Sequence, residues 1–248
     1  MRPLWLASLA LMALCACAKG GSSNHAPPAN AAPAPLANAV QAPAAPSAKL
    51  SQIFTPDILG ANVAYLETLT GPAFSTEGSD RIYKVDGCKV IVGVAGPKID
   101  NIGIEGFSAR CSFPIAQYFA GGYDHPVPPY PTFGDIKTGL GGAYGADCLA
   151  LCGNAANPVV ALSYQGSHAD NFNDLLAEIS IADEPALTAY QDWSDKLAAK
   201  YGQDYVTSGK FNNGDNLDDV VSKDFAPIRP DTIRVGRDLP TPGADAGQ

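Results

Sequence analysis

Six cysteines and three histidines carry the most distinctive chemistry in this chain. Thiols can be acylated, form disulfides or bind zinc, and histidine can act as a catalytic base. The run Ser167-His168-Ala169-Asp170 collects the residue types of a hydrolytic triad, but neighbours along an extended chain point to opposite sides. The sequence contains no GxSxG or HExxH motif. We therefore expect no enzyme, and an envelope hydrolase using His125 or Ser167 and His168 is the alternative.

The start of the chain has the pattern of an export signal. Arg2 supplies a positive charge, and residues 4–14 form an apolar run that is too short to span a bilayer comfortably. No later stretch reaches 18 uninterrupted apolar residues, so we expect no second membrane span.

The residues Leu14-Cys15-Ala16-Cys17 resemble the lipobox of bacterial lipoproteins, in which a small residue precedes the acylated cysteine. Cys17 fits better than Cys15, because bulky Leu14 would occupy the small position before Cys15. The resemblance implies cleavage after residue 16 and attachment to the membrane through lipid on Cys17. Ala18 follows instead of aspartate, which implies the outer membrane and a periplasm-facing protein. A secretory signal that is cut elsewhere is the competing interpretation.

Four cysteines then remain, an even number that in an oxidising compartment favours two disulfides. Of the three possible connectivities we prefer Cys88–Cys111 and Cys148–Cys152, since each pair is close in sequence. If Cys148 and Cys152 stood one turn apart on a regular helix, the bridge would be strained and the helix would have to loosen. A zinc site is the alternative, but paired CxxC spacing is missing.

Charge and composition limit the possible partners. The 248 residues carry a formal net charge of −9, and loss of residues 1–16, which removes Arg2 and no acid, makes it −10. Phosphate binding requires a basic surface, so we expect no nucleic-acid partner. The sequence has no phosphate-cradling loop, and we predict no cofactor and no metal.

The composition divides the chain into segments. We expect a signal peptide, an Ala/Pro-rich tether, a first helix–meander unit, a Pro/Tyr-rich connector, a possible second unit, a C-terminal helical segment and a flexible tail. These segments span residues 1–16, 17–48, 49–113, 114–132, 133–182, 183–225 and 226–248.

The first unit has the clearest local signals. Asn62 is placed to cap a helix that Gly71-Pro72 ends. Asp86-Gly87 separates two strand-like runs and predicts a hairpin, and Gly96-Pro97 predicts the turn into a third strand. Alternation in the strands implies one buried face, covered by helices. The predicted fold class is α+β, with short helices packed on an antiparallel β-meander.

Gly60-Ala61-Asn62, the apolar Leu66 and Leu69, Gly71-Pro72, the hairpin and the returning run GPKIDNI together resemble a known superfamily. It comprises the small lipoproteins of the bacterial barrel-assembly machinery and the β-lactamase inhibitor proteins. The resemblance covers about residues 50–110 and implies a non-catalytic envelope protein that binds other proteins or assists assembly. In this chain the proline stands one place earlier than in the usual pattern.

The inhibitor proteins are tandem repeats, and a second copy is suggested here. Gly60, Leu69 and Gly71 align with Gly142, Leu151 and Gly153 at a constant offset of 82, and the strand from Val90 aligns with one from Val160 at an offset of 70. The run FNDLLAEISI would supply the returning strand.

Two later segments complete the interpretation. Asp183-Glu184-Pro185 opens a helix in which Trp193 is more typical of a packing anchor than of a ligand platform. Residues 215–219 are acidic and fit a helix cap better than a calcium loop, because the calcium-loop spacing is missing.

The connector is the predicted surface for a partner, because loops on rigid scaffolds carry function. The candidate contacts are aromatic and imidazole side chains in the connector and directly after it: Tyr123, His125, Tyr130 and Phe133. Packing as structural cover is the alternative role. We expect the partner to be another protein of the cell envelope. A cell-wall-spacing lipoprotein would need a peptidoglycan-binding motif, and the sequence shows none.

The lipobox interpretation predicts that processing of the full chain is sensitive to globomycin and that the product incorporates labelled fatty acid. Cys17→Ser should abolish the labelling, because it removes the thiol that is acylated. Cys15→Ser is the matched control and should keep it. Continued labelling of the Cys17→Ser protein would contradict the choice of cysteine.

Overall fold

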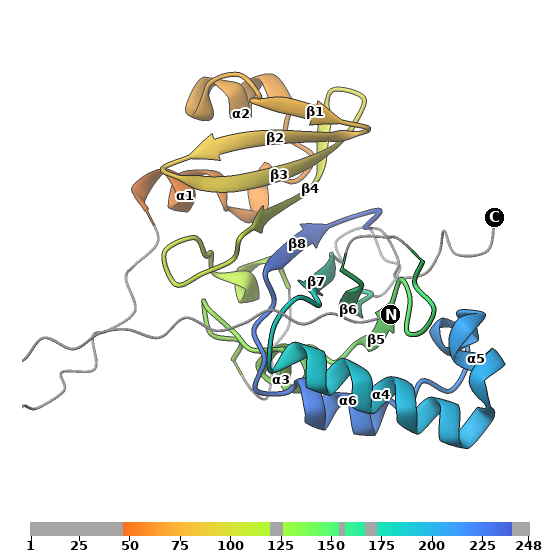
Figure 1. Cartoon of the computed structure of the whole chain (residues 1–248). Helices are drawn as coiled ribbons and strands as arrows, with labels where there is room; N and C mark the ends of the chain where they lie inside the picture. Colours follow the sequence, from red (N-terminus) through yellow and green to blue (C-terminus); the bar gives the residue numbers. More distant parts are fainter. Residues whose placement is uncertain (1–46, 120–125, 154–156, 167–172, 240–248) are drawn as a thin grey trace, which may run out of the picture. The chain divides into compact units, whose positions relative to one another are not determined.

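A computed structural model describes residues 47–119, 126–153, 157–166 and 173–239. These residues form an α+β fold in which one eight-stranded antiparallel sheet packs against short helices (Figure 1). The strand order β1-β2-β3-β4-β8-β7-β6-β5 contains two meanders with the last strand between them. The predicted fold class is confirmed.

The first unit follows its sequence signals. Asn62 accepts a hydrogen bond from the Ala64 N–H at 2.8 Å and so caps α2. Asp86 and Gly87 have φ values of 51° and 86°, as a two-residue hairpin turn with left-handed backbone requires. The elements are α1 (Ala48–Ile53), a 3₁₀ turn η1 (Pro56–Ile58), α2 (Val63–Thr70), β1 (Ser75–Glu77), β2 (Asp80–Val85), β3 (Cys88–Ala95) and β4 (Lys98–Glu105).

The second unit has one α-helix followed by three strands, whereas the first has two α-helices and four strands, and its helix does not lie where the predicted alignment places it. Thr132 and Asp135 form a reciprocal capping box at the start of its helix, α3. The segment from Gly142 that aligns with the first-unit helix instead begins with a strand. The elements after a 3₁₀ turn η2 (Ile115–Tyr118) are α3 (Phe133–Gly139), β5 (Ala143–Ala146), β6 (Val159–Tyr164) and β7 (Asp174–Ser180).

The helix implied by the offset of 82 is therefore wrong, while the strands predicted at Val160 and in FNDLLAEISI are confirmed as β6 and β7. Matches between glycines do not define a helix. A Cβ on Gly142 would lie 2.5 Å from the Ser163 carbonyl oxygen, so this glycine serves close strand pairing.

The outer edge of β5 is closed by side chains. The Asn212 amide accepts from the Ala146 N–H at 3.0 Å and donates to the Ala146 carbonyl at 2.7 Å, as a neighbouring strand would. Asn216 donates to the Tyr144 carbonyl at 2.7 Å. The acidic run at 215–219 thus belongs to edge protection and to the start of the helix Asp218–Phe225. The side-chain cap expected for this run is wrong, because Leu217 is the N-cap of that helix and no side chain caps it. Asp215 is paired with Lys200 at 2.7 Å.

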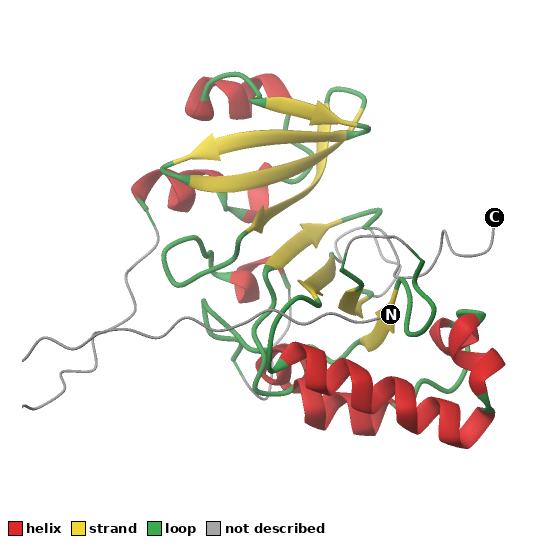
Figure 2. Cartoon of the chain, viewed as in Figure 1, coloured by secondary structure: helices red, strands yellow, loops and turns green. Residues whose placement is uncertain are grey.

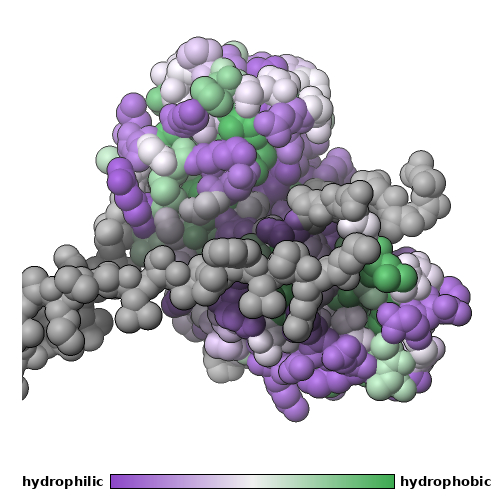
Figure 3. Space-filling view, viewed as in Figure 1, coloured by the Kyte–Doolittle hydropathy of each residue, from purple (hydrophilic) through white to green (hydrophobic). Residues whose placement is uncertain are grey.

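A helical layer follows the second unit (Figure 2). Trp193 is fully buried and donates to the Asn216 carbonyl at 2.7 Å, so it is the expected packing anchor. Figure 3 shows mainly hydrophilic residues on the outward side of this layer. The elements are α4 (Ala186–Tyr201), α5 (Gln203–Thr207), a 3₁₀ turn η3 (Lys210–Asn212), α6 (Asp218–Phe225) and β8 (Thr232–Gly236). Within the described ranges, no helix is long and apolar enough to cross a membrane.

The flexible tail predicted for residues 226–248 is wrong for Thr232–Gly236. This segment is β8, and it pairs antiparallel with both β4 and β7. Ile233 and Val235 point into the same core as Ile102 and Leu175. Helices of both units contribute to that core, so they cover one face of the sheet.

Arg234 points to the opposite face and ties the sheet together. Its guanidinium makes two 2.8 Å hydrogen bonds to the Asp80 carboxylate and also donates to Asn101. Asp80 lies three strands away, about 14 Å in a flat sheet, which exceeds the combined reach of the two side chains. The sheet must therefore curl toward this face. Glycine at 103 makes the crossing possible, because a Cβ there would lie 2.6 Å from Arg234 Cγ.

Ile233→Ala tests the central position of β8. The side chain is 0% exposed, so truncation should lower the unfolding free energy by about 2–5 kcal/mol. Thr76→Ala, on the exposed edge strand β1, should change it by less than about 0.5 kcal/mol. Chemical denaturation measures both, and a neutral Ile233→Ala would contradict the assignment of β8.

Candidate partner-binding site

The predicted contact residues do not form one site among the described residues. Tyr123 and His125 lie outside the residues that the structure describes, as do Ser167 and His168 of the alternative hydrolase. Cys17 also lies outside them. The proposed catalytic and lipid-attachment roles therefore stay predictions.

Phe133 is buried, which corrects its assignment as a partner contact. Its side chain is 0% exposed and packs edge-to-face against Phe225 at 5.9 Å between ring centroids. It is the first residue of α3, directly after the Thr132 cap, and the helix turns it into the core. Its packing against α6 could not be recognised from the connector sequence alone.

Tyr130 is half-buried and lies beside a hollow in the surface. Its ring packs against Phe107 at 5.7 Å, and the Arg229 guanidinium lies 4.6 Å from its centre. A cation over an aromatic face is an attractive contact. Arg229 in turn lines the hollow.

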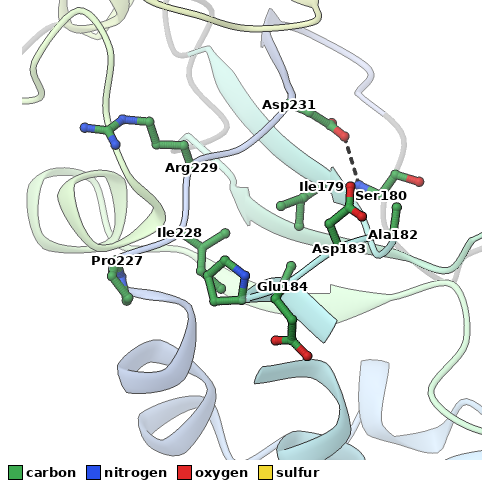
Figure 4. A pocket seen from close by; sticks show the side chains of 11 residues that line it. Ile179, Ser180, Ala182, Asp183, Glu184, Pro227, Ile228, Arg229 and Asp231 are labelled. Atoms are coloured by element: carbon green, nitrogen blue, oxygen red, sulfur yellow. Dashed lines mark hydrogen bonds between the residues drawn. The ribbon is translucent and has the colours of Figure 1, made fainter. Parts of the chain in front are cut away.

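The hollow has a volume of about 430 Å³ and lies between the end of β7, the start of α4 and the segment that enters β8 (Figure 4). Its apolar lining comes from Ile179, Ile228 and the prolines at 185 and 227, and its acidic lining from Asp183, Glu184 and Asp231. In Figure 4 the Arg229 side chain extends away from the acidic residues.

A second hollow of about 410 Å³ adjoins the first, with Ser180 and Asp231 lining both. It adds the carboxylates of Glu105 and Glu178. We call the two together the acidic hollow. Carboxylates from four separate elements and loops meet there. The site could therefore not be predicted from any single stretch of the sequence.

Asp231 holds the acidic hollow together. Its carboxylate accepts from the Ser180 N–H at 3.0 Å, its own N–H donates to the Glu178 carbonyl at 2.9 Å, and its carbonyl accepts from the Phe107 N–H at 2.6 Å. The ends of β4, β7 and β8 are therefore joined at one residue. Asp231 stands one position before β8, so its place depends on the pairing of that strand.

Two carboxyl groups in the acidic hollow have raised pKa values. Burial raises the pKa of Glu178, the nearby charges of Asp231 and Asp147 raise it further, and the Arg234 guanidinium opposes the shift. Burial also raises the pKa of Asp231, against the hydrogen bond from Ser180. A cation in the hollow would favour the ionised form of both.

The chemistry of the acidic hollow favours a cationic, partly apolar group over a metal ion or an anion. Five carboxylates and one arginine line it. Glu105 is paired with Lys89 at 2.5 Å, and the arginine is occupied by Tyr130, so within the part of the chain that the structure describes four carboxylates lack a lysine or arginine ion pair. Among the described residues, no group of three or more acidic, histidine or cysteine side chains is placed to hold a metal.

The four later cysteines form two disulfides, Cys88–Cys111 and Cys148–Cys152. They are the preferred pairs, and they leave no thiolate among these four residues for the alternative zinc site. Cys148 and Cys152 lie in a loop after β5, so the helix strain considered for this pair does not arise.

No family model, curated protein or solved structure matches this chain.

The raised pKa of Glu178 predicts a pH dependence of stability. Between the ordinary carboxyl range and the raised folded pKa, the folded state binds more protons than the unfolded state. The unfolding free energy should therefore fall as the pH rises through that window. Glu178→Gln should flatten this part of the profile, because glutamine does not titrate. Denaturant titrations across the window measure both, and an unchanged slope in the variant would contradict the role of Glu178.

Proposed function

We propose that the protein is a lipid-anchored, non-catalytic binding module of the bacterial cell envelope that serves another envelope protein as partner or assembly accessory. The observation that carries the proposal is the acidic hollow, which combines an apolar lining with five carboxylates at one end of the sheet. Such a surface suits a basic segment of a partner protein.

Three further features support this function. The two disulfides are typical of an oxidising compartment such as the periplasm. The resemblance of residues 50–110 implies a role in protein binding or assembly, and this part of the chain folds as short helices and an antiparallel meander. The lipobox and the Pro-rich tether would hold the folded part near the membrane while leaving it free to reach a partner.

Photo-crosslinking in intact cells tests the binding site. A photoreactive residue in place of the exposed Glu184, on the rim of the acidic hollow, should form an adduct with one envelope protein. The same residue in place of Tyr65, which is exposed on α2 and lines neither hollow, should not form that adduct.

Removing negative charge from the acidic hollow should lower the yield of the adduct formed from position 184. Asp183→Lys with Asp231→Asn removes attraction for a basic segment and should lower the adduct yield roughly tenfold, because a few charge pairs contribute about 1–2 kcal/mol together. Asp192→Lys with Asp204→Asn makes the same change of net charge on exposed positions outside the hollow and should leave the yield unchanged. Equal losses from the two pairs, or no adduct from position 184, would refute the proposed site.

A further inference from the structure

The second disulfide closes a small ring that presents one apolar side chain. Cys148 and Cys152 are four positions apart and enclose Leu149, Ala150 and Leu151. Leu149 points inward and is 2% exposed, whereas Leu151 points outward and is 86% exposed. Leu151 is the most exposed large hydrophobic residue among those that the structure describes.

The backbone at Leu151 is in a conformation that leucine disfavours. Its φ is +56°, in the left-handed region where glycine is the usual residue. Gly153, two residues later, also has a left-handed backbone, with φ +67°, but as a glycine it has no side chain that disfavours this conformation. Unfavourable backbone conformations of this kind concentrate at binding sites, where the side chain is needed more than the relaxed backbone.

The ring is fastened to α4, so Leu151 is presented by a rigid support. The Tyr190 hydroxyl donates to the Cys148 carbonyl at 3.2 Å, and the Ser194 hydroxyl donates to the Leu149 carbonyl at 3.0 Å. The Tyr190 oxygen also lies 3.4 Å from Cys152 Sγ. A backbone that is held in place before binding loses little entropy when a partner covers the side chain it carries.

One hydrogen bond and helix α4 connect the ring to the acidic hollow. Asp147, directly before the ring, accepts from the N–H of Val159, which lines the hollow, at 2.9 Å. Ala186 of α4 lines the other part of the hollow, and Tyr190 stands one helical turn further on.

From these contacts we infer that Leu151 is an apolar anchor that inserts into a pocket of the protein whose basic segment occupies the acidic hollow. The inference rests on the proposed function and adds a second contact to it. The charge of the chain argues for a protein pocket over a lipid surface, since a net charge of −9 is repelled by anionic lipids.

Leu151→Gly separates the binding role from a structural one. Glycine relieves the left-handed backbone, so the variant should melt at the same or a higher temperature than the parent. The yield of the adduct formed from position 184 should nevertheless fall between about tenfold and a hundredfold, because the variant loses a leucine side chain that the partner would bury in the complex. Phe74→Ala, at another exposed hydrophobic residue, is the matched control and should leave the yield unchanged.

Two more measurements complete the test in the full chain. A photoreactive residue at position 151 should form an adduct with the same protein as position 184. The Cys148→Ser, Cys152→Ser variant opens the ring and should reduce the adduct from position 184, with its folding checked by circular dichroism.

Each outcome has a defined meaning. An unchanged adduct yield in Leu151→Gly overturns the anchor and leaves the acidic hollow as the binding site. No adduct from position 184 in the parent overturns both. Binding of the Cys17→Ser protein to phosphatidylethanolamine–phosphatidylglycerol vesicles that Leu151→Gly abolishes would assign Leu151 to a lipid surface and overturn the protein pocket.

Discussion

The pairing of β8 with both β4 and β7 is the interaction on which the rest of the structure depends. The two meanders present edge strands that run in the same direction, and one antiparallel strand between them satisfies the backbone groups of both. Arg234 then crosses the curled face to Asp80, which links this strand to the other side of the first meander. Without β8 the two units would have no common sheet.

The candidate site follows from that pairing. Asp231 lies just before β8 and joins the ends of three strands, so the strand that unites the units also assembles the acidic hollow. Helix α4 extends from the hollow to the ring closed by Cys148 and Cys152. The surface proposed to bind a partner is therefore built from the second unit and its C-terminal additions, and the first unit contributes Glu105, Gly106 and the support of the sheet.

Much of the first unit could be predicted from its sequence, because its signals act between close neighbours. Asn62 caps a helix two residues away, and Asp86-Gly87 supplies the backbone that a tight hairpin needs. The second unit is harder to predict, because its glycines match the spacing of those around the first-unit helix although Gly142 serves strand pairing. The five residues of β8 include the alternating run Thr232-Ile233-Arg234-Val235, a weak strand signal, but the run is short and stands among prolines, aspartates and glycines.

By itself the sequence determined the fold class, the helix cap at Asn62, the hairpin and the preferred cysteine pairs, and it supplied the expectation of a lipid anchor. Only the tertiary structure decided the position of β8, the burial of Phe133, the meeting of carboxylates in the acidic hollow and the exposure of Leu151. The physical reason is the range of the interactions. Caps and turns depend on backbone geometry within a few residues, whereas strand pairing and burial depend on partners that are distant in the chain.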